Sequence, residues 1–278
     1  MHKIKLSGFQ LQVLISLCMY IGQSLVGFTI SWSGPMIPKL QDLDQSPLSQ
    51  NLTDAQASLT ASLLYVGSIP GSYLVGWLSN FKGRKPCLLL GGFVSMTGYI
   101  LLLTTHNVPM LFIGRLLTGL SVGCIFLVVI VYLGEIASTN RRGTLLAIAG
   151  IFTTLGSMSL FSAATFLSYR ESTSVGLAFS IIFILGLLMI PESPMFHVLK
   201  GDDNAVKKTL QDLDRLDDLE KFIVAKEDYR TISNIKDWRD LFTLRNNRKA
   251  LFRLTTINIF QQFSGVMAVV FFSLEYLN

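Results

Sequence analysis

The sequence predicts an all-α membrane protein with seven membrane-spanning helices. Half of its 278 residues are hydrophobic, only 15% are charged, and the mean hydropathy is +0.50. In soluble domains, charged residues make up about a quarter of the total. Seven stretches contain no Asp, Glu, Lys or Arg, and each can cross a bilayer as a helix, which takes roughly 20 residues. These stretches are Leu6–Pro38, Ala55–Phe81, Pro86–Gly114, Leu116–Gly134, Gly143–Tyr169, Ser172–Pro191 and Leu254–Leu274.

Each stretch is expected to be a helix, because a helix satisfies its own backbone hydrogen bonds in lipid. We expect helices near residues 9–33, 57–79, 86–105, 109–133, 144–168 and 173–190, and a last one near 254–276. The first follows Lys3 and Lys5 but is too long for a secretory signal, whose core has about 7–15 apolar residues. Pro35 and Pro38 mark its expected exit.

The spans group into three expected regions. Residues 1–199 form an N-terminal bundle of six spans, residues 200–253 a helical linker, and residues 254–278 a seventh span that opens a further bundle. Within the linker, leucines recur every third residue among charged side chains, which indicates a short amphipathic helix. They are Leu210, Leu213, Leu216 and Leu219. This helix either docks against the ends of the spans or stays solvated.

Glycines in the second and fourth spans predict close helix packing, because small residues let membrane helices approach each other. The second span contains Gly67, Gly71 and Gly76, and the fourth contains Gly114, Gly119 and Gly123.

Basic residues predict how the chain is oriented in the membrane. They precede the first span and gather after the second and fourth, as Lys3, Lys5, Lys82, Arg84, Lys85, Arg141 and Arg142. The loops on the other side hold only Lys39 and Arg170. We therefore expect a multi-pass protein of the plasma membrane with its N-terminus and linker in the cytosol. The sequon Asn51-Leu52-Thr53 then lies in the first outer loop, where Asn51 is a candidate for glycosylation.

Several function classes are excluded. The net charge of +5 is explained by the basic loops and requires no nucleic acid. Cys18, Cys87 and Cys124 lie within or at the edge of spans, as expected of small buried side chains. Neither a disulfide framework nor a metal site is indicated. The histidines are scattered, and no nucleophile–base or metal-ligand spacing occurs, so neither an enzyme nor a cofactor is predicted.

Four polar motifs in fixed order resemble those of a known family. They are Gly76-Trp-Leu-Ser-Asn-Phe-Lys-Gly-Arg-Lys85, Tyr132-Leu-Gly-Glu135 with Arg141-Arg142-Gly143, Pro191-Glu-Ser-Pro194, and Gln261-Gln-Phe-Ser-Gly265. Together they resemble the sugar porter family of the major facilitator superfamily over nearly the whole chain. The last two motifs are most similar to insect facilitated trehalose transporters. The resemblance implies the major facilitator fold, with an N-terminal six-helix bundle, a cytosolic helical linker and the first helix of the C-terminal bundle.

The resemblance also implies a gate of inter-helix ion pairs at the cytosolic rim. Its candidates here are Arg84, Lys85, Glu135, Arg141, Arg142 and Glu192. A charge at a partly buried rim is costly unless it is paired, and pairing that differs between two states biases the equilibrium. The alternative is that these charges only fix the topology. Asn80, Met195 and Ile130 replace an expected carboxylate, arginine and proline, so a thinner gate is expected.

A sugar site needs uncharged donors and acceptors, and amides inside a span are otherwise disfavoured. Gln261 and Gln262 are therefore candidate sugar contacts, a role that the resemblance also implies; helix–helix hydrogen bonding is the alternative. Thr154, Gln23 and Thr29 are further polar candidates. Other contacts of the family are replaced by Met267, Phe271-Phe272 and Gly150. The pocket is thus expected to be less polar than a glucose site, and either trehalose or a hexose could be the substrate.

Proton coupling is disfavoured because the first three spans contain no carboxylate. Proton-driven relatives place an aspartate in the first span near an arginine in the fourth; here Arg115 is present, but Thr29 holds the other position. Arg115 is expected to snorkel from the outer part of its span. Facilitative transport by alternating access is predicted for the full-length form. The alternatives are a proton-coupled symporter and a non-transporting sensor or truncated paralogue.

Carriers of this class hold substrate between two bundles. The chain accordingly reads as C-terminally incomplete, with the C-terminal bundle of the same protein as its missing partner. These 278 residues alone are expected not to transport.

Overall fold

The computed structural model describes residues 8–42, 46–138, 141–216 and 242–265, and it divides into two units. The first unit, Met1–Leu216, contains nine described helices. They are α1 (Gly8–Ser31), α2 (Ser33–Gln41), α3 (Asp54–Lys82), α4 (Arg84–Leu103), α5 (Val108–Ile136), α6 (Arg142–Phe166), α7 (Tyr169–Met189), α8 (Pro194–Lys200) and α9 (Asp203–Asp212). The described part of the second unit, Asp217–Asn278, contains α12 (Arg245–Phe263).

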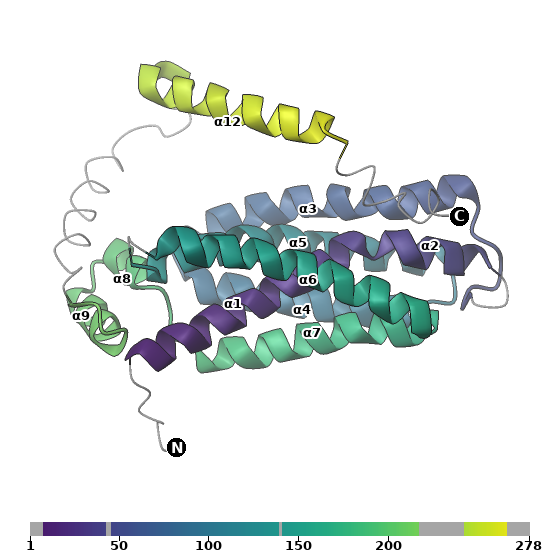
Figure 1. The fold of residues 1–278 in the computed structure, drawn as a ribbon, viewed down its shortest axis with the longest axis horizontal. Helices are drawn as coiled ribbons and strands as arrows, with labels where there is room; N and C mark the ends of the chain where they lie inside the picture. Colours follow the sequence, from purple (N-terminus) through teal and green to yellow (C-terminus); the bar gives the residue numbers. More distant parts are fainter. Residues whose placement is uncertain (1–7, 43–45, 139–140, 217–241, 266–278) are drawn as a thin grey trace. The chain divides into compact units, whose positions relative to one another are not determined.

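The six long helices of the first unit lie side by side and run up and down along one axis (Figure 1). Helices α3, α5 and α7 end where α1 begins, and α8 and α9 lie at this same end, which we call the charged rim. At the opposite end, α1 breaks at Trp32 and continues as α2. The expected helix end near residue 33 agrees with the end of α1 at Ser31, whereas the short helix α2 up to Gln41 was not expected. Pro35 lies in the first turn of α2, where its missing N–H costs no hydrogen bond.

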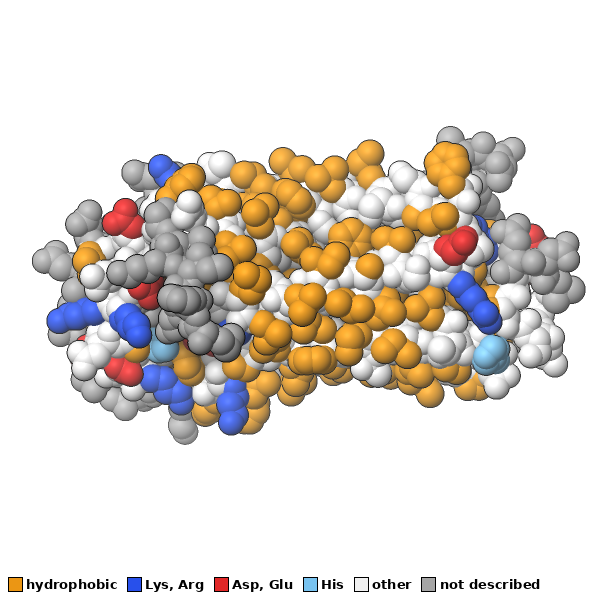
Figure 2. All heavy atoms as spheres, turned by 90° about the horizontal axis from the view of Figure 1, so that it is seen from below, with side chains coloured by type: hydrophobic (Ala, Val, Ile, Leu, Met, Phe, Trp, Pro, Cys, Tyr) orange, Lys and Arg blue, Asp and Glu red, His pale blue; other side chains and the backbone are white. Residues whose placement is uncertain are grey.

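The surface of the bundle suits a bilayer. In Figure 2, hydrophobic side chains cover its middle, whereas charged side chains gather towards the two ends. Among the described residues, five helices are long and apolar enough to span a membrane, namely α1, α4, α5, α6 and α7. Helix α3 is as long as α5 but carries many hydroxyls, and these bond within the helix, as Thr60 Oγ1 does to the Gln56 carbonyl at 2.7 Å. The expected seventh span is described only as far as residue 265.

Close helix pairs hold the bundle together. A Cβ atom at Gly67 of α3 would lie 2.2 Å from the Leu116 carbonyl oxygen of α5, so only glycine fits there. Likewise, a Cβ at Gly27 of α1 would lie 1.8 Å from the Thr153 oxygen of α6. The predicted close packing is thus confirmed at Gly67, and likewise at Gly71, Gly119 and Gly123, where a Cβ would lie 2.1–2.3 Å from a backbone oxygen of the facing helix; at Gly76 it would meet nothing within 4 Å.

The start of the linker packs on the bundle. Leu210 and Leu213 are fully buried, and Gln12 of α1 donates to the Leu213 carbonyl at 2.7 Å. Leu216 is half exposed, and Leu219 lies outside the described residues. The amphipathic segment was expected either to dock on the spans or to stay solvated, and its α9 part docks.

Candidate functional site

A tight turn brings three helix ends together at the charged rim. Gly83 joins α3 to α4 with a φ of 99°, which a residue with a side chain rarely adopts. A Cβ on Gly83 would also lie 2.4 Å from an oxygen of the Glu192 carboxylate. This position therefore requires glycine for two separate reasons, and the turn directs Arg84 into the rim.

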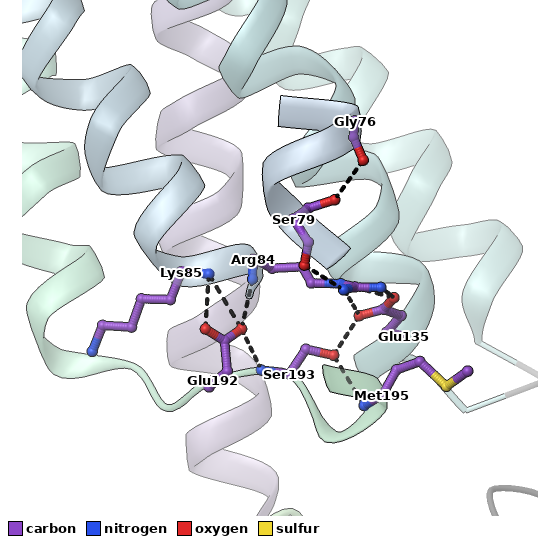
Figure 3. Close-up of polar contacts among 8 residues, drawn as sticks. All are labelled: Gly76, Ser79, Arg84, Lys85, Glu135, Glu192, Ser193 and Met195. Carbon is purple, nitrogen blue, oxygen red and sulfur yellow. Dashed lines mark hydrogen bonds and ion pairs between the residues drawn. The ribbon is translucent and has the colours of Figure 1, made fainter. Parts of the chain in front are cut away.

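Arg84 of α4 and Glu135 of α5 form an ion pair (Figure 3). The Arg84 Nε lies 3.2 and 3.1 Å from the two Glu135 carboxylate oxygens, and the Arg84 Nη2 lies 2.7 Å from Glu135 Oε1. Nη1 donates to the Ser79 carbonyl of α3 at 2.9 Å. Arg84 is only 6% exposed. Charge-assisted bonds of this fork geometry are the stronger kind, so one side chain ties α3, α4 and α5 together.

Glu192 caps the N-terminus of α4. Its carboxylate accepts the backbone N–H groups of Arg84 at 2.9 Å, Lys85 at 3.2 Å and Ser193 at 2.9 Å. A negative charge at a helix N-terminus satisfies free N–H groups and complements the helix dipole. The Ser193 hydroxyl donates in turn to the Glu135 carboxylate. The two carboxylates are thus joined through Ser193, as Figure 3 shows.

Lys85 and Tyr132 fasten the segment that follows α7. Lys85 Nζ donates to the Ile190 carbonyl at 2.7 Å, and the Tyr132 hydroxyl donates to the Pro191 carbonyl at 2.6 Å. We call Arg84, Lys85, Glu135, Glu192 and Ser193 the rim network. It contains four of the six residues predicted for a gate, together with a serine that the prediction left out.

The other two predicted gate residues lie elsewhere. Arg141 and Arg142 are exposed at the N-terminus of α6. The positive end of a helix dipole repels cations, so these side chains remain in solvent. Asn80 is exposed too, and the Ser79 carbonyl serves as an additional partner of Arg84. The backbone N–H of Met195 donates to Ser193 Oγ at 3.2 Å, which caps the start of α8.

The predicted sugar contacts of the first unit differ in their surroundings. Thr29 is buried, and its hydroxyl bonds to the Tyr99 hydroxyl at 2.8 Å and the Leu25 carbonyl at 2.7 Å, which is a packing role. Thr154 is exposed on α6, one turn beyond Gly150, where a Cβ would meet nothing within 4 Å.

Gln23 is 1% exposed and only half satisfied. Its Oε1 lies 3.1 Å from Thr153 Oγ1, while Nε2 has no partner among the described residues. The Thr153 hydroxyl also lies 3.1 Å from the Ala149 carbonyl, and its single proton cannot serve both acceptors. With either orientation of its amide, Gln23 keeps one buried polar atom unpaired within the described part of the chain.

The remaining predicted positions belong to the second unit or to a loop. Gln261 and Gln262 are in the last turn of α12, in the second unit, and are described only within it. Asn51 is exposed in the loop before α3, two residues before Thr53, which caps that helix.

Arg115 contradicts its expected snorkelling. It is completely buried, over the Trp32 ring at 4.8 Å. Its guanidinium donates to Ser33 Oγ at 2.7 Å and to the carbonyls of Thr60 at 3.3 Å and Thr29 at 3.4 Å. The break between α1 and α2 supplies two of these acceptors, Ser33 Oγ and the Thr29 carbonyl, because the carbonyls at a helix end lack partners of their own, whereas the Thr60 carbonyl belongs to α3. The polar run Ser31-Trp-Ser-Gly34 is the signal in the sequence that marks this break.

Comparisons with known proteins agree with this architecture. The family model described as "Sugar (and other) transporter" matches residues 15–277. The facilitated trehalose transporter Tret1 of Culex quinquefasciatus is 29% identical over 269 residues, which cover 95% of this chain and 52% of that protein. Tret1 of Apis mellifera ligustica is 26% identical over 275 residues, covering 96% of this chain and 54% of that protein. The chain therefore spans about half the length of these curated relatives.

Solved structures show the same fold. The inward-open xylose transporter XylE from E. coli has a TM-score of 0.72 at 18% identity, covering 95% of this chain and 64% of that one. The proton:xylose symporter XylE bound to 6-bromo-6-deoxy-D-glucose has a TM-score of 0.74 at 19% identity, covering 96% and 62%. The prediction of an all-α membrane protein with the major facilitator fold is confirmed.

Proposed function

The chain belongs to the sugar transporter family, and from that premise we propose that it forms part of a facilitative carrier for trehalose or a hexose. The carrier lies in the plasma membrane with the charged rim in the cytosol, and it works by alternating access. Substrate binds between the six-helix bundle and a second bundle, of which α12 is the first helix. The proposed sugar contacts are Gln261, Gln262, Gln23 and Thr154.

The rim network is the observation that carries this proposal. Its bonds join the ends of α3, α4 and α5 and the segment after α7, so the bundle can move as one body. A carrier that rocks two bundles about a central site needs such rigidity in each of them. We propose that the same network is the inner gate.

The surroundings of Arg115 support facilitation over proton coupling. The side chain is held by two carbonyls, a hydroxyl and an indole, all uncharged. The only acidic residues before Glu135 are Asp42, Asp44 and Asp54, all in or beside the loop between the first two spans. A coupled proton would need a titratable group on the transport path, and the carboxylates of α1 to α5 lie only at helix ends: Asp54 begins α3, and Glu135, in the last turn of α5, is paired with Arg84.

The test is uptake of labelled trehalose and hexoses by cells that lack their own carriers, expressing the complete coding sequence. We expect saturable uptake that persists when a protonophore removes the proton gradient. Gln261→Ala and Gln262→Ala should each raise the half-saturating concentration about tenfold, the loss expected for one hydrogen-bonding amide.

Asn258→Ala is the matched control on the same helix. Its amide donates to the Leu254 carbonyl at 2.9 Å within α12, so uptake should be unchanged. Absence of saturable uptake would contradict the carrier. Uptake that collapses with the proton gradient would contradict facilitation.

A further inference from the structure

The three long helices that end at the charged rim all receive a cation at their last carbonyls. For α3, Arg84 Nη1 donates to the Ser79 carbonyl at 2.9 Å. For α7, Lys85 Nζ donates to the Ile190 carbonyl at 2.7 Å. For α5, Arg215 Nη1 donates to the Glu135 carbonyl at 3.3 Å and to that of Ile136. Cations at a helix C-terminus give its last carbonyls a charged donor and complement the dipole.

The cap of α5 differs in origin from the other two. Arg84 and Lys85 begin α4 inside the bundle, whereas Arg215 belongs to the linker, three residues after α9 ends. Arg215 is nevertheless only 8% exposed. Burying a guanidinium to this degree costs free energy unless its N–H donors are hydrogen-bonded. The bonds to the α5 carbonyls offset that cost.

The backbone that carries Arg215 is fixed on α1. Leu213 is fully buried and its carbonyl accepts the Gln12 amide at 2.7 Å. Asp214 adopts a left-handed φ of 54°, and a Cβ on Gly8 would lie 2.4 Å from Asp214 Cβ. The turn after α9 therefore presses against the beginning of α1 and aims the Arg215 side chain at the end of α5.

Glu135 lies between two arginines. Its carboxylate binds Arg84, while its carbonyl binds Arg215. Fixing the carbonyl fixes the last turn of α5 and with it the direction in which the carboxylate projects. Docking of the linker and the Arg84–Glu135 pair therefore share one residue.

We propose that Arg215 is a positioning residue of the gate: by capping α5 it orients Glu135 towards Arg84 and couples docking of the linker to the rim ion pair. The gating role rests on the proposed function, whereas the coupling itself is a property of the fold. Arg215 touches no substrate in this scheme and acts only through Glu135.

Hydrogen exchange on the purified 278-residue chain in lipid nanodiscs tests the coupling. In Arg215→Gln, we expect amides of both α9 and the last turn of α5 to exchange about tenfold faster, because local opening no longer breaks charge-assisted bonds. Arg215→Lys keeps the charge without the planar fork and should give a smaller change. Lys208→Gln, at an exposed position of α9, is the matched control and should exchange as the wild type does.

A double variant separates coupling from simple loss of structure. If the proposal holds, Glu135→Gln also speeds exchange in α9, and Arg215→Gln combined with Glu135→Gln speeds it less than the product of the two single effects. Unchanged α9 exchange in Arg215→Gln, or effects that multiply independently, would overturn it. Should Arg215→Gln fail to fold, Arg215→Lys and Glu135→Gln answer the same question.

Uptake by the complete carrier tests the gating role independently. Arg215→Gln should change the maximal rate by about threefold or more while the half-saturating sugar concentration stays the same, since no sugar contact is touched. If wild-type uptake is absent but exchange in α9 and α5 remains coupled, the proposed function fails and the positioning role stands. An equal change in both kinetic constants would contradict a role through the gate.

Discussion

At the scale of single residues, the rim network is most sensitive at Glu135. Glu135→Gln leaves the buried Arg84 without its countercharge and replaces one of the two acceptor oxygens that Arg84 and Ser193 share with an NH2 donor. Removing one partner of a buried pair costs about 3–5 kcal/mol, and less where part of the pair is exposed, so we expect a loss of about 2 kcal/mol. Thermal or denaturant unfolding in detergent measures this loss. Arg142→Gln, at an exposed site, should change stability by less than about 0.5 kcal/mol.

Thr29 offers a direct test of the coupling mechanism. Its hydroxyl lies beside Tyr99, and its carbonyl accepts from Arg115 at 3.4 Å. Thr29→Asp introduces a titratable carboxylate at a residue whose backbone carbonyl already contacts a buried cation. We expect uptake by the complete carrier to be slowed and to recover only as the pH falls through the pKa of the new carboxylate, because the ionised carboxylate pairs with Arg115, which lowers that pKa, and protonation releases it. Thr29→Asn, similar in shape but without a charge, should leave uptake independent of pH; an equal response in both variants would contradict this account.

The residue scale also shows where sequence reasoning is sufficient. The Arg84, Glu135 and Glu192 motifs were recognisable because each follows the end of an apolar stretch, and the structure brings them together. The expected snorkelling of Arg115 is wrong, because its burial depends on the break at Trp32, which hydropathy does not reveal. Arg215 was not predicted at all, since its partners are backbone carbonyls, which no side-chain pattern encodes.

At the scale of helices, the pair α3–α5 depends on a glycine contact. Gly67→Ala would place a methyl group 2.2 Å from the Leu116 carbonyl oxygen and force the helices apart. Overpacking of this kind costs about 1–3 kcal/mol, and thermal unfolding of the purified protein measures it. Gly76→Ala is the matched control on the same helix, where nothing lies within 4 Å. It should be neutral or slightly stabilising, because alanine favours helix over glycine by about 1 kcal/mol. Equal effects at both positions would contradict the packing explanation.

Helix positions followed from the charge-free stretches with small errors. The fourth was expected near 109–133 and is found at Val108–Ile136. Docking of α9 could not be decided in the same way. The leucine spacing indicates an apolar edge, but what covers it depends on Gln12 and Gly8, about 200 residues earlier in the chain.

At the scale of the whole molecule, transport requires two bundles around one site. Residues 1–278 contain one six-helix bundle and the described α12. We therefore expect these residues, expressed alone in carrier-deficient cells, to reach the membrane but to give no saturable sugar uptake. Surface labelling confirms delivery, and uptake of labelled sugar gives the outcome. Robust saturable uptake would show that the bundle can form a path without a second one facing it.

The three cations at the charged rim also set an order of events during synthesis. Arg84 follows Ser79 by only five residues, so α3 can be capped as soon as the next helix begins. The cap of α5 joins Ile136 to Arg215, which is made 79 residues later. The cap of α7 joins Lys85 to Ile190, which is made 105 residues later. At roughly 5–20 residues per second, the end of α5 stays open for about 4–16 s after it is made. During that interval Glu135 can already pair with Arg84, but the last carbonyls of α5 still lack the hydrogen bonds from Arg215. The bundle therefore matures only when the ribosome has passed into the linker, and a nascent chain arrested before Arg215 would carry six spans and an unfinished rim.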